Sequence, residues 1–91
     1  MLFEWDGKKA AKNRTKHGIS FEACEDFAWH KAVIFSDTRH DYREERSVAI
    51  GPIDERLYVI VYVRRGERTR IISLRKANER ERRIYEEETT D

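Results

Sequence analysis

The segment of residues 57–63, LYVIVYV, constrains the fold more than any other part of this sequence. All of its residues are hydrophobic and most are β-branched or aromatic, a composition typical of a strand at the centre of a sheet. The chain has 91 residues, and a chain of this length buries only about 60–65% of the surface that its unfolded form exposes. We therefore expect a small core arranged around this strand.

Shorter segments on either side of the central strand also have strand character. After it, Gly66 can supply the positive φ of a hairpin turn, and residues 70–74 form the returning strand. Before it, Arg46, Val48 and Ile50 alternate with the smaller Ser47 and Ala49, which suggests a half-buried strand, and Gly51-Pro52 can end or turn that strand. Two further candidates are a hydrophobic run at 32–35 and a short edge strand at 2–5.

Two helices are expected before the main part of the sheet. Asp6 can cap the first, which should run to about residue 16 or 17 and stop at Gly18. Ser20 can cap the second. The hydrophobic residues of this second helix follow the spacing of a stripe that faces a core, and they are Phe21, Cys24, Phe27 and Ala28.

A third helix is expected after the sheet. Asn78 and Glu81 form a variant of the capping box, and the helix should extend towards residue 87. Its large hydrophobic side chains are Ile84 and Tyr85. The order of elements predicts one α+β domain over residues 1–91, with an antiparallel four- to five-stranded sheet, two N-terminal helices and one C-terminal helix. We expect the helices to cover one face of the sheet.

Positive charge is concentrated in the second half of the chain. The formal net charge is +1, yet residues 56–83 hold ten Lys or Arg, nine of them Arg, against three acidic residues. A basic block in a nearly neutral protein predicts phosphate or an acidic protein as the partner. The predominance of arginine favours planar, bidentate recognition.

Cysteine usage and hydropathy indicate the compartment. Cys24 is the only cysteine, so no disulfide can form within the chain and a reducing environment is expected. On a helical stripe, this thiol is not expected to be a nucleophile. No hydrophobic run approaches the roughly 18 residues of a membrane-spanning helix, and the first nine residues lack the order of a signal peptide. We therefore expect a cytoplasmic protein without a membrane partner.

Three stretches have an order and spacing that cover nearly the whole chain: Phe3-Glu4-Trp5-Asp6, then Lys16-His17-Gly18-Ile19-Ser20-Phe21-Glu22-Ala23, then Arg70-Ile71-Ile72-Ser73-Leu74-Arg75-Lys76-Ala77 followed by Glu81-Arg82 and Tyr85. In this combination the chain resembles the BrnT family of type II toxin–antitoxin systems. Two local departures concern loop geometry. Residues 28–31 lack the acidic-proline turn of the family, and Arg43 stands where a glycine is expected before Glu44.

The resemblance implies a RelE-like fold and a metal-independent endoribonuclease that cleaves RNA and arrests translation and growth. It also implies neutralisation by a co-encoded, BrnA-like antitoxin with a DNA-binding domain, through which the complex could reach operator DNA. No cofactor is expected.

Metal-free cleavage of RNA needs three chemical groups. A base takes the 2′-hydroxyl proton, a cation stabilises the charge on the phosphorane, and an acid protonates the leaving 5′-oxygen. Arginine supplies charge but stays protonated, so proton transfer is expected from Lys16, His17, Glu45 or Tyr85. Simpler roles are open for three of them. Cations at 16 and 17 can complement the helix dipole, and Tyr85 can stack on a base or pack the last helix onto the sheet.

The phosphate-binding cations are expected on the face of the sheet that the helices leave open. Strand alternation places Ser73 and Arg75 there, because Ile72 and Leu74 should face the helices. Thr69 and Ile71 would share the face of Ser73, and Arg70 and Lys76 the face of Leu74.

Arginines on the neighbouring strands extend this hypothesis. Arg46 and Arg64 are expected to meet Arg75 and clamp a phosphate bidentately. The alternatives are an Arg75 that is only solvated, and an Arg46 partly buried in an ion pair with Glu22 or Glu45.

The candidate residues form two groups. The catalytic candidates are His17, Lys16, Arg46, Arg64, Arg75 and Tyr85. The RNA-binding candidates are Arg65, Arg70, Ser73, Lys76 and Arg82. No metal site is predicted, because four side chains that could converge in a loop lack tight ligand spacing: His30, Asp37, His40 and Asp41.

Two functions without catalysis would use the same basic block. A nucleic-acid-binding regulator would show steeply salt-dependent binding and leave its RNA or DNA unchanged. A protein-interaction module would direct the cations at an acidic partner. Acidic residues on the second expected helix argue against a DNA-groove reader: Glu22, Glu25 and Asp26.

Overall fold

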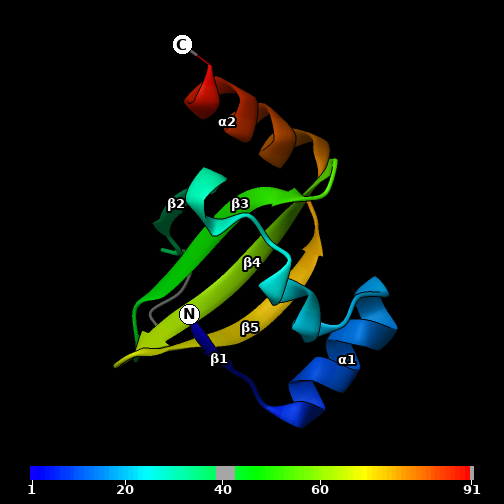
Figure 1. Ribbon diagram of the computed structural model, residues 1–91, viewed down its shortest axis with the longest axis vertical. Helices are drawn as coiled ribbons and strands as arrows, with labels where there is room; N and C mark the ends of the chain where they lie inside the picture. Colours follow the sequence, from blue (N-terminus) through cyan, green and yellow to red (C-terminus); the bar gives the residue numbers. More distant parts are fainter. Residues whose placement is uncertain (39–42, 91) are drawn as a thin grey trace.

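A five-stranded sheet forms the centre of the protein, in the order β1-β5-β4-β3-β2. The structure is a computed structural model and describes residues 1–38 and 43–90. Its elements, shown in Figure 1, are β1 (Leu2–Glu4), α1 (Gly7–His17), the 3₁₀ helices η1 (Phe21–Glu25) and η2 (Trp29–Lys31), β2 (Val33–Ser36), β3 (Arg46–Ile53), β4 (Arg56–Arg65), β5 (Arg68–Lys76) and α2 (Glu79–Thr89). The α+β class is confirmed.

Strand β4 occupies the middle of the sheet, as the hydrophobic segment 57–63 predicts. Its residues Val59 to Val63 are all buried, because β3 and β5 flank it on both sides with antiparallel pairing. Gly66, at φ 60°, lies in the turn between β4 and β5, which confirms the predicted hairpin.

The expectation of a purely antiparallel sheet is wrong at β1. This edge strand pairs with β5 in parallel, with Phe3 opposite Thr69. A parallel neighbour needs a long connection, and here the connection is nearly the whole chain, which no local pattern reveals.

Strand β3 runs through Gly51-Pro52, where an end or a turn was expected. The turn comes later, at Asp54, which has φ 54°. Gly51 serves packing instead, because the ring of Phe27 lies so close that a Cβ at residue 51 would be 2.8 Å from Phe27 Cζ. The Pro52 carbonyl accepts a hydrogen bond from the Ala28 N–H at 2.9 Å, which fixes the loop above the strand.

Helix α1 begins and ends where the sequence predicts. The Asp6 carboxylate accepts a hydrogen bond from the Lys8 N–H at 2.9 Å, and Gly18 ends the helix with φ 72°. No helix among the described residues combines the length and the hydropathy that crossing a bilayer requires.

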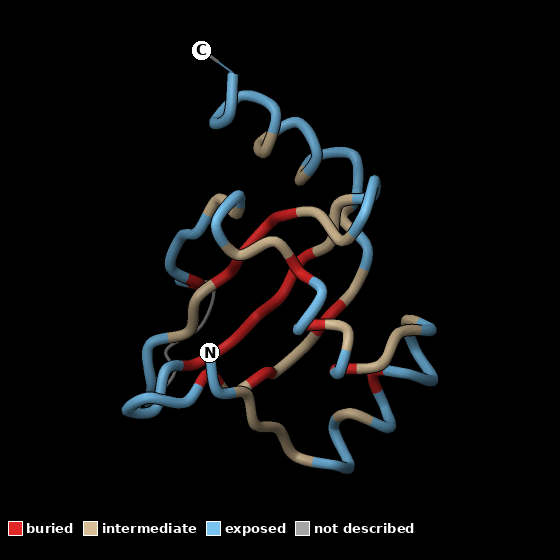
Figure 2. The backbone as a smooth tube through the Cα atoms, viewed as in Figure 1, coloured by how far each residue is buried: buried red, intermediate tan, exposed pale blue. Residues whose placement is uncertain are grey.

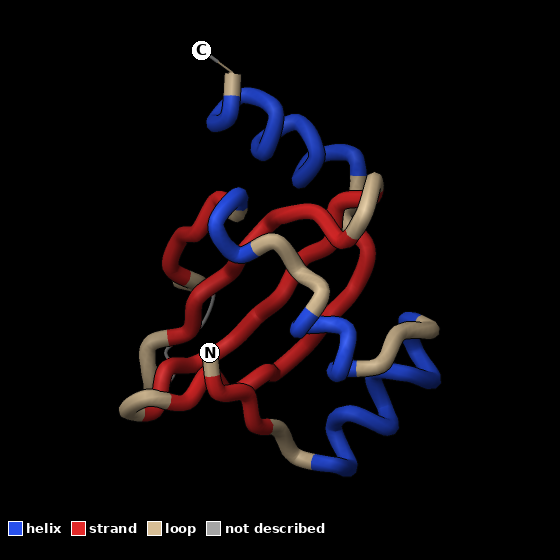
Figure 3. The backbone as a smooth tube through the Cα atoms, viewed as in Figure 1, coloured by secondary structure: helices blue, strands red, loops and turns tan. Residues whose placement is uncertain are grey.

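The second predicted helix is not an α-helix. Ser20 caps it as expected, but residues 21–25 form the 3₁₀ helix η1, and η2 follows after a break (Figure 3). Phe21, Cys24 and Phe27 recur every three residues, which matches the three residues per turn of a 3₁₀ helix. The Trp29 indole N–H donates to the Cys24 carbonyl at 3.0 Å, which holds the break.

The two α-helices lie on opposite faces of the sheet, which corrects the expectation of a single covered face. One face, here called the α1 face, packs against α1, η1 and η2, and its core includes Phe21, Ile60 and Leu74. The other, the α2 face, carries a core of Val48, Ile50, Val59 and Val61, which Ile84 and Tyr85 of α2 cover. A strand as hydrophobic as β4 requires cover on both sides, and Figure 2 shows its buried path between them.

Candidate active site

A β-bulge in β5 decides which side chains share the α2 face. Ile71 lies opposite Tyr62 and Ser73 lies opposite Val61, so Ile72 is an extra residue without a partner on β4. The bulge shifts the alternation by one residue. Ile71 and Leu74 therefore both reach the core of the α1 face, while Arg70 lies on the α2 face with Ser73.

This register confirms part of the predicted assignment and corrects the rest. Ser73 and Arg75 do lie on the face opposite Leu74, as expected, since Arg75 pairs with Val59 of the α2-face core. Simple alternation is wrong for Thr69, Arg70, Ile71 and Ile72, since Thr69 pairs with Phe3 on the α1 face and does not share the face of Ser73. Ile72 packs against the α2-face core, where the expectation placed it under the N-terminal helices.

A hollow of about 340 Å³ lies between α2, the end of β2 and the α2 face of the sheet. Val48, Val59 and Val61 form its hydrophobic floor. Its polar walls are Ser36, Asp37, Thr38, Arg75, Arg80 and Glu81. Cationic and acidic side chains thus face one space on this side of the sheet.

Glu81 holds Arg75 in this hollow. Arg75 Nη1 donates to Glu81 Oε1 and Arg75 Nη2 donates to Oε2, both at 2.7 Å. Glu81 Oε1 also accepts the Asn78 N–H at 2.9 Å, and Asn78 Oδ1 accepts the Glu81 N–H at 2.9 Å, so the predicted capping box is confirmed. Burial raises the pKa of Glu81, but the hydrogen bonds from Arg75 and the Asn78 N–H outweigh it and leave the pKa below its ordinary value.

Asp37 lines the hollow immediately after the end of β2. It is only 8% exposed, and its N–H donates to the Arg46 carbonyl at 2.8 Å. A carboxylate and the guanidinium of Arg75 therefore border the same small volume. Chemically, a carboxylate can accept a proton and a guanidinium can stabilise negative charge.

The predicted meeting of Arg46, Arg64 and Arg75 does not occur. Arg46 lies opposite Val63, so the next residue of β4, Arg64, points to the α1 face. Arg46 and Arg75 share the α2 face, but they are separated by two strand spacings, about 10 Å, and by four residue levels, about 13 Å.

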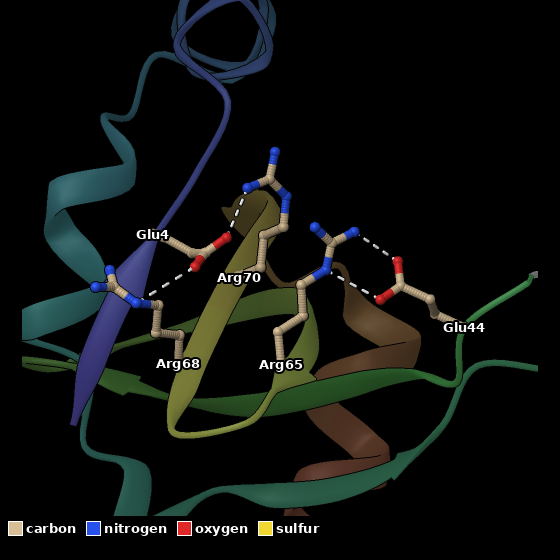
Figure 4. Close-up of polar contacts among 5 residues, drawn as sticks. All are labelled: Glu4, Glu44, Arg65, Arg68 and Arg70. Carbon is tan, nitrogen blue, oxygen red and sulfur yellow. Dashed lines mark hydrogen bonds and ion pairs between the residues drawn. The ribbon is translucent and has the colours of Figure 1, made fainter.

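A second group of arginines lies at the hairpin end of the α2 face (Figure 4). Arg65 donates to both oxygens of Glu44, at 3.0 Å from Nε and 2.6 Å from Nη2. Arg70 Nη1 donates to Glu4 at 2.7 Å, and Arg68 Nε lies 3.8 Å from the same carboxylate. The pKa of Glu44 is lowered, chiefly by its hydrogen bond from Arg65. Desolvation opposes this effect, and the charges of Arg65, Arg70 and Arg46 lower the pKa further. The RNA-binding candidates Arg65 and Arg70 are therefore neighbours.

His17 lies near Arg75 but outside the hollow. Helix α1 is fixed to β5 by Asn13, whose Nδ2 donates to the Leu74 carbonyl at 2.7 Å and whose Oδ1 accepts the Leu74 N–H at 3.2 Å. One turn later, burial lowers the pKa of His17, and the charges of Lys16 and Arg75 lower it further. Lys16 is exposed.

The remaining candidates lie elsewhere. Tyr85 packs against the α2-face core, and its hydroxyl donates to the Lys31 carbonyl at 3.0 Å, which favours the packing alternative. Lys76 and Arg82 line another hollow with Arg56, next to the Asp54 turn. Of the side chains considered for metal binding, His30 is exposed, while His40 and Asp41 lie outside the described residues. Burial raises the pKa of Cys24 to about 12, which keeps the thiol protonated.

Sequence reasoning missed three features of the hollow. Arg80 was not singled out, Glu81 was considered as a helix cap and part of the family motif but not as a partner of Arg75, and Asp37 was considered only as a metal ligand. Arg75 lies near the end of β5 and Glu81 in the first turn of α2, so neither strand nor helix periodicity relates the two residues. Their contact could therefore be found only in the three-dimensional structure.

Comparison with known proteins agrees with the motifs. No curated protein matches the sequence. The family model described as the ribonuclease toxin BrnT of a type II toxin–antitoxin system matches residues 5–81. This match covers most of the chain, including β5 and the Arg75–Glu81 pair, and confirms the resemblance. The chain therefore belongs to the BrnT family of ribonuclease toxins, whose members act in type II toxin–antitoxin systems with an antitoxin partner.

Proposed function

We propose that residues 1–91 form a single toxin domain that cleaves RNA internally without a metal ion and thereby arrests translation and growth. Its site is the hollow between α2 and β2. The observation that carries this proposal is that Arg75, fixed by two hydrogen bonds to Glu81, borders the same 340 Å³ as Asp37.

The proposed reaction is attack of the 2′-hydroxyl on the adjacent phosphorus. The 2′-oxygen–phosphorus bond forms and the bond from phosphorus to the 5′-oxygen breaks. The leaving 5′-oxygen takes up a proton from solvent water in the open hollow, so the products are a 2′,3′-cyclic phosphate and a 5′-hydroxyl. Arg75 and Arg80 stabilise the charge on the phosphorane oxygens. Removing one such donor typically slows a reaction by about 10²–10³-fold.

Asp37 and His17 are the two candidates for the base that accepts the 2′-hydroxyl proton. Asp37 is favoured because it lines the hollow. His17 has a lowered pKa, so it is largely unprotonated near neutral pH, which also suits a proton acceptor. General base catalysis contributes about 10²–10⁴-fold in rate.

We further propose that the chain acts in the cytoplasm, where its RNA substrates are, and that a BrnA-like, DNA-binding antitoxin neutralises it and brings the complex to operator DNA. Membership of a type II toxin–antitoxin family supports a partner of this kind.

The test is cleavage of a defined RNA by the purified chain with excess chelator. We expect cleavage, products with cyclic phosphate and 5′-hydroxyl ends, and a loss of at least about 10²-fold for Arg75→Ala. Arg14→Ala, an exposed position on α1, is the matched control. RNA binding without cleavage would overturn the proposal in favour of a non-catalytic module, and 5′-phosphate products would overturn the mechanism.

A further inference from the structure

The α2 face has a covered half and a polar half. Helix α2 packs mainly on β3 and β2, and below it β3 and β4 carry Val48, Ile50, Val59 and Val61. Strand β5 presents polar side chains on the same face instead. We call these four side chains, Arg68, Arg70, Ser73 and Arg75, the β5 strip.

The β-bulge creates this strip. In a regular strand, residues 68 and 70 would lie on the face opposite residues 73 and 75. Because Ile72 is the extra residue, the phase changes there, and all four side chains lie on one face. The pairing of Arg70 with Glu4 of β1, which lies on the face opposite Phe3, agrees with this placement.

We propose that the β5 strip binds the sugar–phosphate backbone of single-stranded RNA that leads into the hollow at Arg75. This rests on the proposed function, because the strip ends at the same arginine. From residue 68 to residue 75 the strand extends about 20 Å, which is enough for several consecutive phosphates. Ser73 contributes a neutral hydroxyl donor between the two arginine groups.

The arginines of the strip already bind carboxylates in a geometry that phosphate can adopt. Fork-shaped guanidinium groups recognise both anions through parallel N–H bonds. Arg68 and Arg70 share one carboxylate, Glu4, so this part of the strip retains positive charge. In this interpretation Glu4 orients the two arginines until a phosphate replaces it.

The composition of the strip favours RNA over an acidic protein. Tightly bound protein partners insert aromatic or aliphatic anchors into a hydrophobic patch. The strip presents three arginines and a serine, and its only hydrophobic neighbour on β5, Ile72, is turned into the α2-face core. Nucleic-acid backbones, in contrast, are bound mainly through cations and hydroxyl donors.

The first experiment measures binding of a fluorescent, uncleavable 2′-O-methyl oligoribonucleotide as a function of salt. Each lost phosphate contact reduces the slope of log K against log salt by about 0.7 for a single strand. We expect the double variant Arg68→Ala/Arg70→Ala to lower this slope by about 1.4. The matched control is Arg56→Ala, an exposed arginine at the opposite end of β4, and it should leave the slope nearly unchanged.

A second variant gives an effect of opposite sign. Glu4→Gln removes the carboxylate that competes for Arg68 and Arg70, so RNA binding should tighten and the salt slope should increase. If the two arginines only anchor β1, Glu4→Gln would lower thermal stability without any gain in RNA binding. That result, or an unchanged slope in a double variant that is folded by circular dichroism, would overturn the proposal.

Cleavage kinetics separate this inference from the proposed function. For the double variant, kcat/KM should fall more for a long oligoribonucleotide than for a dinucleotide, mainly through KM. If the protein binds RNA through the strip but cleaves none, the proposed reaction is refuted, while the proposal that the strip binds RNA is supported. Normal RNA binding combined with lost antitoxin binding would refute the strip as an RNA site.

Discussion

Replacement of Glu81 tests whether the Arg75–Glu81 pair positions the hollow's main cation. Glu81 accepts two charge-assisted hydrogen bonds from Arg75 and one hydrogen bond from the Asn78 N–H. Its side chain is 16% exposed and that of Arg75 is 29% exposed, so solvent screens the pair only in part. We take about 1–2 kcal/mol for the pair and about 1 kcal/mol for the helix cap.

Glu81→Ala should therefore destabilise the protein by about 2–3 kcal/mol. For a domain of this size that lowers Tm by about 10–20 °C, at about 4–8 °C per kcal/mol. Arg75 would lose its fixed orientation, and a displaced phosphate-binding group should cost about 10–100-fold in kcat/KM. Differential scanning calorimetry and single-substrate cleavage kinetics measure the two effects.

A double-mutant cycle assigns the effect to the pair. Glu81→Ala and Arg75→Ala should show a coupling energy of about 1 kcal/mol or more. The pKa of Glu81 lies below its ordinary value in the folded protein, so the coupling is fully present above the ordinary carboxyl pKa. It should be lost as the pH falls through the folded-state pKa.

One further variant separates the helix cap from the charge of Glu81, and a second variant serves as a control. Glu81→Gln keeps an oxygen acceptor for the Asn78 N–H but removes the charge, so it should restore part of the stability and little of the activity. Glu79→Ala breaks an exposed pair with Arg83, in which the side chains are 83% and 70% exposed, and should cost only about 0.2–0.5 kcal/mol. A coupling energy below about 0.3 kcal/mol, or equal effects of Glu79→Ala and Glu81→Ala, would refute the positioning role.

Two other predictions concern packing and proton transfer. Gly51→Ala places a Cβ 2.8 Å from Phe27 Cζ and should lower the free energy of unfolding by about 1–3 kcal/mol, measured by chemical denaturation. Gly7→Ala is the control, because a Cβ there meets nothing within 4 Å, and it should not destabilise the protein. Equal denaturation midpoints for the two variants would contradict the packing role of Gly51. If His17 is the base, the cleavage rate of the unmodified chain should fall as the pH drops below 6.5 through the lowered pKa of His17, and His17→Gln should lack this limb. An identical pH profile for His17→Gln would exclude His17 and leave Asp37, the favoured candidate, as the base.

Features that depend on neighbouring residues could be predicted from the sequence. The Asp6 cap, the Gly18 stop, the Asn78–Glu81 box and the Gly66 turn each rest on a few consecutive side chains, and all are confirmed. The position of β4 followed from its uninterrupted hydrophobic residues.

Features that depend on distant residues could not be predicted. The parallel pairing of β1 with β5 joins residues 66 apart in the chain, as in the Glu4–Arg70 bond. The 3₁₀ helix at residues 21–25 is followed by a loop that is held to β3 by the hydrogen bond from the Ala28 N–H to the distant Pro52 carbonyl. The predicted meeting of Arg46, Arg64 and Arg75 failed for the same reason, because it depends on the register between strands: Arg46 pairs with Val63, so Arg64 points to the other face. The bulge in β5 had no local signal either, and it changes the face of the β5 side chains that precede it.

The bulge at Ile72 links the core to the proposed RNA surface. Ile71 and Leu74 are three residues apart, and a regular strand would place them on opposite faces. Both are fully buried in the core of the α1 face, and this is possible only because an extra residue lies between them. The same extra residue moves Arg68 and Arg70 out of the α1 face, where Phe3 and Tyr62 pack, and onto the face of Arg75. The packing of two hydrophobic side chains therefore determines which face of the sheet carries Arg68 and Arg70. A change that removes the bulge should disrupt both the packing of the core and the binding of RNA.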